Sequence, residues 1–249
     1  MYLNDVLEVY TPDAQRMAKV RAAAAKLVLM LSSFVAPYRL SISYSGSISK
    51  GTSVITGTDL DLFISLSSQT PFTLQQIYLG LVSYLRTRGY HARPQNVSVG
   101  LTFDNLKVDL TPGRRHSQHG DDHSLYLSKR GTWTQTNITK HRAHVVGSGR
   151  VDEIRLAKIW RHVHAIEFPS FALELAVIEA LHGALTGVIE QNFVRVLEYF
   201  ADELERARLV DPANQGNIVS DDMTAAELKD IATHARRSLG SSRWDQVVW

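Results

Sequence analysis

Residues 46–61 read GSISKGTSVITGTDLD, and the fold that the sequence predicts follows from this segment. Its last three residues open an apolar run, DLDLFISL, in which turn residues give way to leucine, isoleucine and phenylalanine. Such a run predicts a β-strand, whose side chains alternate between two faces. Leu60 and Leu62 then face the core. Asp59 and Asp61 share the other face, with Cα atoms roughly 6–7 Å apart.

A third acid, Asp109, lies in the segment LKVDLTP, where apolar residues again alternate with other residues. Val108 and Leu110 are expected in the core, so Asp109 takes the opposite face. If the two strands are neighbours, Asp109 lies beside the acids of the first strand. Three carboxylates form a hard oxygen site suited to Mg²⁺ or Mn²⁺, and two such ions could activate a hydroxyl and stabilise a leaving pyrophosphate.

Each acid also has a simpler explanation, because an aspartate at the start of a strand is commonly a turn or capping residue. Two acids aligned on an otherwise apolar strand fit that explanation poorly, since unpaired they repel each other and destabilise the sheet. Locally unfavourable residue choices concentrate at functional sites. We therefore expect a catalytic metal site formed by Asp59, Asp61 and Asp109.

The turn ahead of the first strand contains Gly46-Ser47 and then Lys50-Gly51-Thr52. Glycine lets backbone N–H groups approach a phosphate closely, and a serine hydroxyl adds a hydrogen-bond donor. The segment differs from a Walker A loop, because lysine precedes glycine and the order Gly-Lys-Ser/Thr is absent. Gly46 and Ser47 are therefore candidates for nucleotide binding on a different scaffold.

Patterning over the rest of the chain predicts a mixed α/β half followed by a helical half. Thr11-Pro12 and Thr70-Pro71 each combine an N-cap with a following proline, so we expect helices from there to about residues 34 and 88. The polar stretch after Pro112 predicts loops and short hairpins. The two halves are residues 1–130 and 131–249. Further strands are expected at 40–44, 97–103 and 106–110, and helices near 151–165, 170–186, 190–209 and 224–238.

Composition restricts the class of protein and its partners. The 249 residues include no cysteine, which excludes disulfides, zinc fingers and thiol catalysis and fits a cytoplasmic protein. The apolar stretch from Ala22 to Ala36 contains Lys26 and is too short to span a bilayer, so we expect no membrane partner. The net charge of +2 is mildly basic, which is compatible with small anionic substrates or a short stretch of RNA.

The order of the motifs is specific. Gly46-Ser47, Lys50-Gly51-Thr52, Asp59-Leu60-Asp61 and the distant Val108-Asp109-Leu110 together resemble the signature of DNA polymerase β-type nucleotidyltransferases. The helical half resembles that of the oligoadenylate synthetases, the bacterial cGAS/DncV-like nucleotidyltransferases (CD-NTases) and the archaeal CCA-adding enzymes. This second likeness depends on Arg155, Lys158, Trp160, Ser170, Phe171, Glu174, Leu175, the segment 211–217 and the closing helix that ends at Trp244.

The resemblance covers most of residues 40–249 and implies both fold and activity. The fold would be α/β, with a polymerase β-like palm built on a mixed sheet and an N-terminal helix in residues 1–130. Residues 131–249 would form an all-helical, nucleotide-binding half. The implied activity is the metal-dependent transfer of NMP from an NTP to a hydroxyl group.

The resemblance also implies roles for individual residues. Ser47 would bind the triphosphate, and the three aspartates would hold the metal ions. Lys158 and Ser170 would reach the β- and γ-phosphates from the helical half, and Phe171 would stack on the base. Lysine, serine and an aromatic ring suit these roles chemically. Two alternatives stay open, since Lys158 could be a solvated helix charge and Phe171 an ordinary core residue.

Three histidines suggest a rival metal site. His116, His119 and His123 lie within eight residues of one another, together with Asp121 and Asp122, which could indicate zinc. Without cysteines or a helical frame, however, this spacing is a weak signal. We therefore expect a solvated loop here rather than a zinc site.

We expect the protein to make a short or cyclic oligonucleotide signal from NTPs, as the bacterial immune-signalling relatives do in antiviral defence. The alternative is an RNA 3′-end nucleotidyltransferase similar to the CCA-adding group, and RNA is a possible acceptor or activator. The length leaves no room for the additional RNA-binding domains of that group, and the mild charge agrees. A catalytically inactive nucleotide-binding module or a protein-modifying nucleotidyltransferase fits less well, because all three acids and a long helical half are present.

Overall fold

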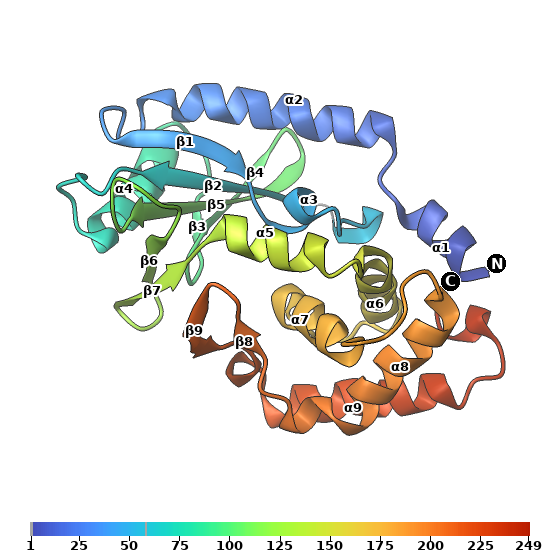
Figure 1. Ribbon diagram of the computed structural model, residues 1–249. Coiled ribbons are helices and arrows are strands. Elements are labelled where there is room, and N and C mark those ends of the chain that lie inside the picture. Colours follow the sequence, from blue (N-terminus) through green and yellow to red (C-terminus); the bar gives the residue numbers. More distant parts are fainter. Residues whose placement is uncertain (1, 58) are drawn as a thin grey trace. The chain divides into compact units, whose positions relative to one another are not determined.

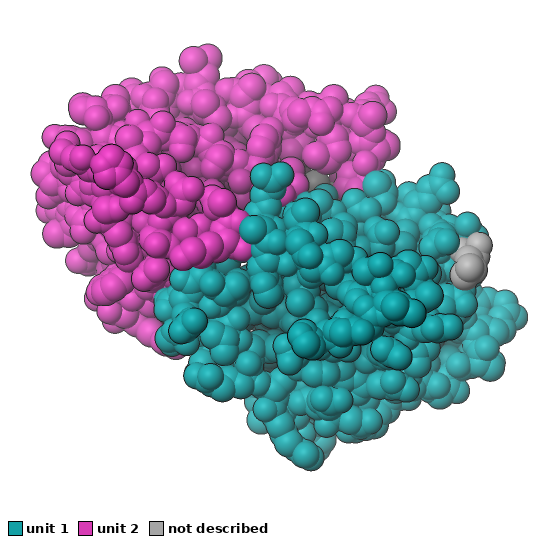
Figure 2. Space-filling model, in the orientation of Figure 1, with its two compact units in different colours: residues 1–11, 50–57, 141–249 teal, residues 12–49, 58–140 magenta. Residues whose placement is uncertain are grey.

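The computed structural model describes residues 2–57 and 59–249, and the chain forms two compact units (Figure 2). Unit 1 comprises residues 1–11, 50–57 and 141–249, and unit 2 comprises residues 12–49 and 58–140. The sequence places its boundary at residue 130, whereas the chain passes between the units several times. The segment 50–57, which lies between the candidate turn and the first aspartate, belongs to the mainly helical unit 1.

Unit 2 is built on a mixed sheet, which the described residues form from seven strands in the order β1-β2-β5-β4-β3, with β6 pairing with β5 and β7 (Figure 1). β2 and β5 are parallel, and the other pairs are antiparallel. The strands are β1 (Arg39–Tyr44), β2 (Leu60–Leu66), β3 (Arg93–Pro94), β4 (Val99–Phe103), β5 (Leu106–Arg115), β6 (His123–Leu127) and β7 (Thr132–Thr136); the helices are α2 (Ala14–Met30), α3 (Gly46–Lys50, whose last residue belongs to unit 1), α4 (Leu74–Arg86) and the 3₁₀ turn η1 (Leu31–Ser33).

The helices α2 and α4 cover one face of the sheet (Figure 1). Leu27 of α2 and Leu81 of α4 are fully buried against this face. Leu62 of β2 and Leu110 of β5 project into the same core, as the alternation in the sequence predicts. The carboxylates of β2 and β5 are therefore on the other face.

That other face is polar at one end and closed at the other. The Phe63 ring lies edge-on to the His123 ring at 4.8 Å between centroids, and Ser65 Oγ shares a 2.8 Å hydrogen bond with His123 Nε2. β5 extends to Arg115, five residues beyond the predicted end of the strand, and its Pro112 pairs with Ile64 of β2. Phe63 and Ser65 of this face are thus covered by His123 of β6, and Asp61 lies nearer the start of β2.

Two predicted helix starts are wrong by two to three residues. α2 is capped by Asp13, whose side chain accepts a hydrogen bond from the Arg16 N–H, rather than by Thr11. Thr11 instead donates its hydroxyl to the Leu7 carbonyl and ends the preceding helix. α4 is capped by Thr73 and not by Thr70, which donates its hydroxyl to the Ser67 carbonyl in a turn. In both cases the earlier threonine is used by the element before the helix.

Unit 1 is mainly helical and contains two helices that the sequence pattern did not predict, α1 (Tyr2–Tyr10) and α5 (Ile138–Gly147, whose first three residues belong to unit 2). The expected helices end earlier than predicted, at residue 180 in place of 186 and at 202 in place of 209. The remaining elements are α6 (Val151–Val163), α7 (Ser170–Ala180), α8 (Ile189–Asp202), α9 (Ala225–Leu239), the hairpin β8 (Val210–Asp211) and β9 (Asn214–Ile218), and the 3₁₀ turns η2 (Ile55–Gly57), η3 (Leu204–Arg206), η4 (Val219–Asp222) and η5 (Trp244–Gln246).

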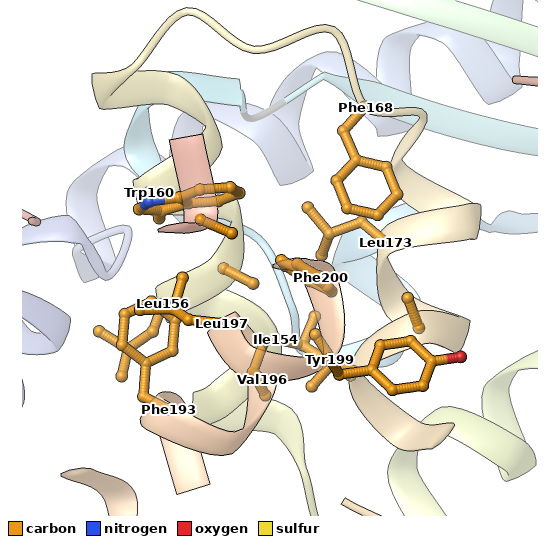
Figure 3. Close-up of a cluster of buried hydrophobic side chains, with 14 of the residues drawn as sticks. Ile154, Leu156, Trp160, Phe168, Leu173, Phe193, Val196, Leu197, Tyr199 and Phe200 are labelled. Carbon is orange, nitrogen blue, oxygen red and sulfur yellow. The ribbon is translucent and has the colours of Figure 1, made fainter. Parts of the chain in front are cut away.

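Large side chains from α6, α7 and α8 fill the core of unit 1 (Figure 3). Trp160 of α6 and Phe200 of α8 are almost fully buried, with ring centroids 5.7 Å apart. The Trp160 indole N–H donates to Ser238 Oγ of α9 at 2.9 Å, which satisfies its one polar atom. Val54 belongs to the same core, so the segment 50–57 is packed into unit 1. None of the helices in the described part of the chain has the length and apolar character needed to cross a bilayer.

Candidate active site

The parallel pairing of β2 and β5 brings two of the predicted metal ligands together. Asp61 of β2 is in register with Asp109 of β5, and the neighbouring Leu60 is in register with Val108. Partners in register on adjacent strands project to the same face about 5 Å apart. The expected adjacency of Asp61 and Asp109 is therefore confirmed. Asp59 lies just ahead of β2 rather than inside it, which corrects the predicted start of the strand.

The environment of Asp109 shows that Asp59 is nevertheless close. Burial is the main cause that raises the pKa of Asp109, and the negative charge of Asp59 raises it further. A hydrogen bond from Gln95 Nε2 to Asp109 Oδ1 (2.8 Å) and the charge of Arg93 act in the opposite direction. Gly100, in register with Asp109 on β4, makes room for this arrangement, because a Cβ there would lie 2.6 Å from Gln95 Nε2.

The candidate turn packs directly on Asp61. Gly46 has a φ of +56°, and a Cβ at this position would lie 1.7 Å from Asp61 Oδ2. The Ser45 N–H donates to the Asp61 carbonyl at 2.9 Å, and Ser49 Oγ donates to the Gly46 carbonyl at 3.0 Å. Ser47 follows in the short helix α3 and is half-buried. Only glycine fits at position 46, because any side chain there would displace the Asp61 carboxylate.

The donors at this site suit a divalent cation in type and charge. Carboxylate oxygens are the ligands that Mg²⁺ and Mn²⁺ prefer, and a cation would offset the repulsion between Asp59 and Asp109. In residues 2–57 and 59–249, however, no three His, Asp or Glu side chains are arranged to hold a metal ion. The structure does place Asp61 and Asp109 in register on neighbouring strands, with the charge of Asp59 acting on Asp109.

The histidines of the rival site are used differently. His123 is buried, with Nε2 bonded to Ser65 Oγ and Nδ1 2.8 Å from the Asp121 carbonyl oxygen. Burial is the main cause that lowers the pKa of His123. Asp122 bonds to Asn137 and Lys140 at 2.9 and 3.2 Å. Both ring nitrogens of His123 are thus engaged, Nε2 with Ser65 of β2 and Nδ1 with the backbone just ahead of β6.

In unit 1, Glu174 of α7 is the centre of a buried ionic cluster. Its Oε2 accepts a hydrogen bond from Lys50 Nζ at 2.7 Å. Its Oε1 accepts from Lys158 Nζ of α6 at 2.7 Å and from Thr52 Oγ1 at 2.9 Å. Lys158 Nζ also donates to Thr52 Oγ1 (2.9 Å) and to the Thr52 carbonyl (3.3 Å). Lys158 is 3% exposed, which excludes the alternative of a solvated helix charge.

The charges of Lys158 and Lys50 outweigh the effect of burial on the pKa of Glu174. Burial alone would raise the pKa of Glu174, but the charges of Lys158 and Lys50 outweigh it and hold the pKa at about 2. Burial lowers the pKa of Lys158, while Glu174 opposes that change. The cluster is thus a charged tether that holds the segment 50–52 to α6 and α7.

Ser170 is the first residue of α7 and is exposed. Its Oγ accepts a hydrogen bond from Arg161 Nη1 of α6 at 3.0 Å, and the same nitrogen donates to the Phe168 carbonyl at 2.6 Å. Ser170 is therefore next to an arginine rather than next to Lys158.

Phe171 is half-buried and has polar neighbours. Lys50 Nζ lies 5.0 Å from the centre of its ring, which is within the range of a cation–π contact. The His141 ring lies 4.8 Å from the Phe171 ring, and His141 Nε2 is 2.7 Å from Asp211 Oδ1. Phe171 also packs against the core of unit 1, so core packing and an aromatic surface for a base both remain compatible with its position.

The predicted site residues thus form one group in each unit. Unit 2 holds the group of Gly46, Ser47, Asp59, Asp61 and Asp109, and unit 1 holds the group of Lys158, Ser170 and Phe171. Sequence reasoning missed Gln95, Gly100 and Arg161. Gly100 had a usable signal, because glycine inside a strand often marks a close approach. Arg161 had one too, because it lies three residues after Lys158 on the same helix face.

Comparison with known proteins agrees with this architecture. The sequence matches no protein-family model and no curated protein. The structure is similar to CdnG, a CD-NTase of Bradyrhizobium diazoefficiens in complex with GTP (TM-score 0.76, 14% identity, 99% of this chain and 94% of that one covered).

Two further solved structures are similar. They are CdnE, a cyclic dinucleotide synthase of Elizabethkingia meningoseptica (TM-score 0.70, 13% identity, coverage 89% of this chain and 92% of that one), and a cytoplasmic RNA terminal U-transferase (TM-score 0.65, 12% identity, coverage 99% and 96%). Identities this low establish likeness of fold. The chain therefore shares its fold with these CD-NTases and with the terminal U-transferase.

Proposed function

We propose that this protein is a metal-dependent nucleotidyltransferase that transfers NMP from an NTP to a hydroxyl group. One observation carries the proposal, namely the parallel register that places Asp61 beside Asp109, with the Gly46 turn packed on Asp61. In the reaction the hydroxyl oxygen bonds to the α-phosphorus, the bond from that phosphorus to the bridging oxygen breaks, and pyrophosphate leaves. The hydroxyl proton passes to a carboxylate or to water.

Residues of both units have roles in this proposal. Asp59, Asp61 and Asp109 would hold Mg²⁺ or Mn²⁺, which when bound neutralises charge on the phosphates and on the attacking oxygen. The turn at Gly46 makes room for the Asp61 carboxylate, and Ser47 offers a hydroxyl donor to a phosphate. The nucleotide-binding group of unit 1 comprises Lys158, Ser170 and Phe171.

The proposed product is a short or cyclic oligonucleotide made from NTPs alone. The likeness of fold to CdnG and to the cyclic dinucleotide synthase CdnE supports this choice. Incubation with each labelled NTP and Mg²⁺, with and without RNA, tests it. We expect small labelled products without RNA, and none from the Asp61→Asn variant.

The alternative is addition of nucleotides to an RNA 3′ end, and a specific observation favours it. Unit 2 carries 14 Lys and Arg against 7 Asp and no Glu, a formal charge of +7, whereas unit 1 carries −5. The mild charge of the whole chain is thus the sum of two opposite charges. Efficient labelling of RNA, with no product from NTPs alone, would replace the first proposal by this one.

A further inference from the structure

A cleft of about 420 Å³ lies in unit 1, at the C-terminal ends of α7 and α8. Its walls come from Glu179 of α7, from Tyr199 and Asp202 of α8, and from residues between 203 and 208. Glu179 and Ser170 are separated by roughly 14 Å along the axis of α7, at about 1.5 Å per residue. The cleft is therefore distinct from the candidate nucleotide-binding group at the start of α7.

Tyr199 links this cleft to the interior of unit 1. Its side chain is 8% exposed, and its ring packs in the hydrophobic core. Tyr199 also lines the cleft, and Figure 3 shows its hydroxyl directed away from the core. Within the described residues this hydroxyl makes no hydrogen bond. Buried hydroxyl groups generally have a partner, because an unmade hydrogen bond costs free energy. The unpartnered phenol therefore indicates a ligand in the cleft.

The surroundings of the Tyr199 hydroxyl are negative. Burial, followed by the negative charges of Glu179 and Glu203, raises the pKa of Tyr199 to about 12. The phenol is thus neutral at physiological pH, and its oxygen can accept a hydrogen bond. In the described part of the chain neither glutamate has an ion-pair partner. The C-terminal ends of α7 and α8 add partial negative charge, so this side of the cleft suits a cationic group.

An ammonium group fits these acceptors in number. It has three N–H donors, and the phenol oxygen of Tyr199 and the carboxylates of Glu179 and Glu203 offer three acceptors. A metal ion fits less well, because a protonated phenol is a poor metal ligand. Moreover, no three His, Asp or Glu side chains in residues 2–57 and 59–249 are arranged to hold a metal ion.

Two arginines, Arg206 and Arg208, line the same cleft. Neither forms an ion pair within the residues that the structure describes, although Glu179 and Glu203 border the same space. The third acid of the cleft, Asp202, is paired with an arginine of α9 at 3.3 Å. The lining thus contains two unpaired carboxylates and two unpaired guanidinium groups. A ligand that carries both charges would satisfy both, and a guanidinium group binds a carboxylate through two parallel hydrogen bonds.

From these contacts we propose that the cleft binds a small zwitterion of the size of an amino acid. Its ammonium group donates to Tyr199, Glu179 and Glu203, and its carboxylate accepts from Arg206 or Arg208. The volume of about 420 Å³ lies in the range of small-molecule sites. The inference is independent of the proposed function, because it uses none of the residues assigned to nucleotidyl transfer.

The test titrates each of the free α-amino acids of proteins into the full chain by calorimetry. For an amino acid that binds, its N-acetyl and carboxamide derivatives are titrated as well, since each removes one of the two charges. Putrescine and Mg²⁺ are the probes for a simple cation site.

The variants are Tyr199→Phe and Glu203→Gln, each with a matched control. Tyr126→Phe is the control for the first, because Tyr126 of β6 is half-buried and its hydroxyl also makes no hydrogen bond in the described chain. Glu205→Gln is the control for the second, because Glu205 is an exposed acid outside the lining of the cleft. The thermal unfolding midpoint of each variant is measured in parallel.

We expect at least one amino acid to bind, and Tyr199→Phe and Glu203→Gln to weaken its affinity by about 10-fold each, as for a lost hydrogen bond to a charged group. Both blocked derivatives should lose binding, and both control variants should behave as wild type. The unfolding midpoint of Tyr199→Phe should stay at the wild-type value, because the hydroxyl bonds to no other described group.

Binding of no amino acid overturns the inference. So does an affinity that is unchanged in Tyr199→Phe, a carboxamide that binds as well as the acid, or binding of putrescine or Mg²⁺ in place of an amino acid. Nucleotidyl transfer is scored separately. A wild type that forms product but binds no amino acid refutes the inference alone, and amino-acid binding without product refutes only the proposed function.

Discussion

At the level of single residues, Gly46 and Gly51 both have a left-handed backbone conformation, but their surroundings differ. Both have positive φ, +56° and +73°, so alanine at either position costs roughly 1–2 kcal/mol in backbone strain. A Cβ on Gly51 meets nothing within 4 Å, whereas a Cβ on Gly46 would overlap the Asp61 carboxylate. We expect Gly51→Ala to lose only the strain energy. Gly46→Ala should lose more stability and most of the activity, as denaturant unfolding and turnover would show.

The aspartates allow a second prediction. Replacing Asp59 and Asp61 by alanine should abolish turnover and preserve the fold, because neither side chain belongs to the core face of the sheet. In metal-free protein the unfolding midpoint should hold or rise, since Asp59 repels Asp109. The control is Asp104→Asn, which alters an exposed acid paired with Lys26 in the same unit. Turnover at the wild-type rate in the double variant would show that the site is assigned wrongly.

Sequence reasoning reached these residues to different degrees. Alternation alone was enough to place Asp61 and Asp109 on one face, because a strand has only two faces and the leucines occupy one of them. The buried state of Lys158 depends on Glu174 and Thr52, which lie 16 and 106 residues away in the chain. No local pattern in EIRLAKIWR reports such partners, so the sequence predicts a phosphate-binding lysine or, as the alternative, a solvated one, and not a buried ion pair.

At the level of elements, the tether between α6, α7 and the segment 50–52 should be sensitive to acid. The pKa of Glu174 is about 2 in the folded protein and near 4.5 when unfolded. A depressed pKa stabilises the fold above pH 4.5, and this contribution is lost as the pH falls from 4.5 toward 2. The loss amounts to about 3 kcal/mol of the free energy of unfolding. Denaturant unfolding of unit 1 across this pH range measures it.

The comparison for this prediction is the double variant Glu174→Gln/Lys158→Met, which removes both charges of the closest pair. Its free energy of unfolding should fall less steeply than that of the wild type between pH 4.5 and 2. Parallel pH curves for the two proteins would mean that other carboxylates, such as Asp211 with its lowered pKa, account for the acid sensitivity.

The elements also show where local signals mislead. Thr11-Pro12 and Thr70-Pro71 carry real capping chemistry, but each threonine closes the preceding element, and Asp13 and Thr73 cap the helices. α5 was read as loop because its sequence, ITKHRAHVVG, has few apolar residues. It buries only Val145, so tertiary packing rather than amphipathic periodicity accounts for it.

At the level of the whole molecule, the charge separation makes salt the discriminating variable. The +7 of unit 2 is enough to attract a nucleic acid, so the mild total charge is a poor argument against RNA. An RNA-adding enzyme should lose affinity for single-stranded RNA with a log–log salt slope of about −0.7 per phosphate contacted. For a synthetase of short oligonucleotides we expect product formation from NTPs that is unaffected by added RNA. Titrations at 50 and 200 mM salt separate the two.

The interleaved chain also sets an order of folding during synthesis. α1 leaves the ribosome before the other described helices, yet it packs on α6 and on residues 244–246, and the Tyr2 hydroxyl donates to the Val248 carbonyl at 3.0 Å. The core of unit 1 therefore closes only after nearly the whole sequence has emerged, whereas unit 2 has all its strands by residue 140. On a nascent chain, the sheet with its aspartates would form early. The segment 50–57 would then be unpacked, with Val54 exposed to solvent. Chaperones would bind this intermediate.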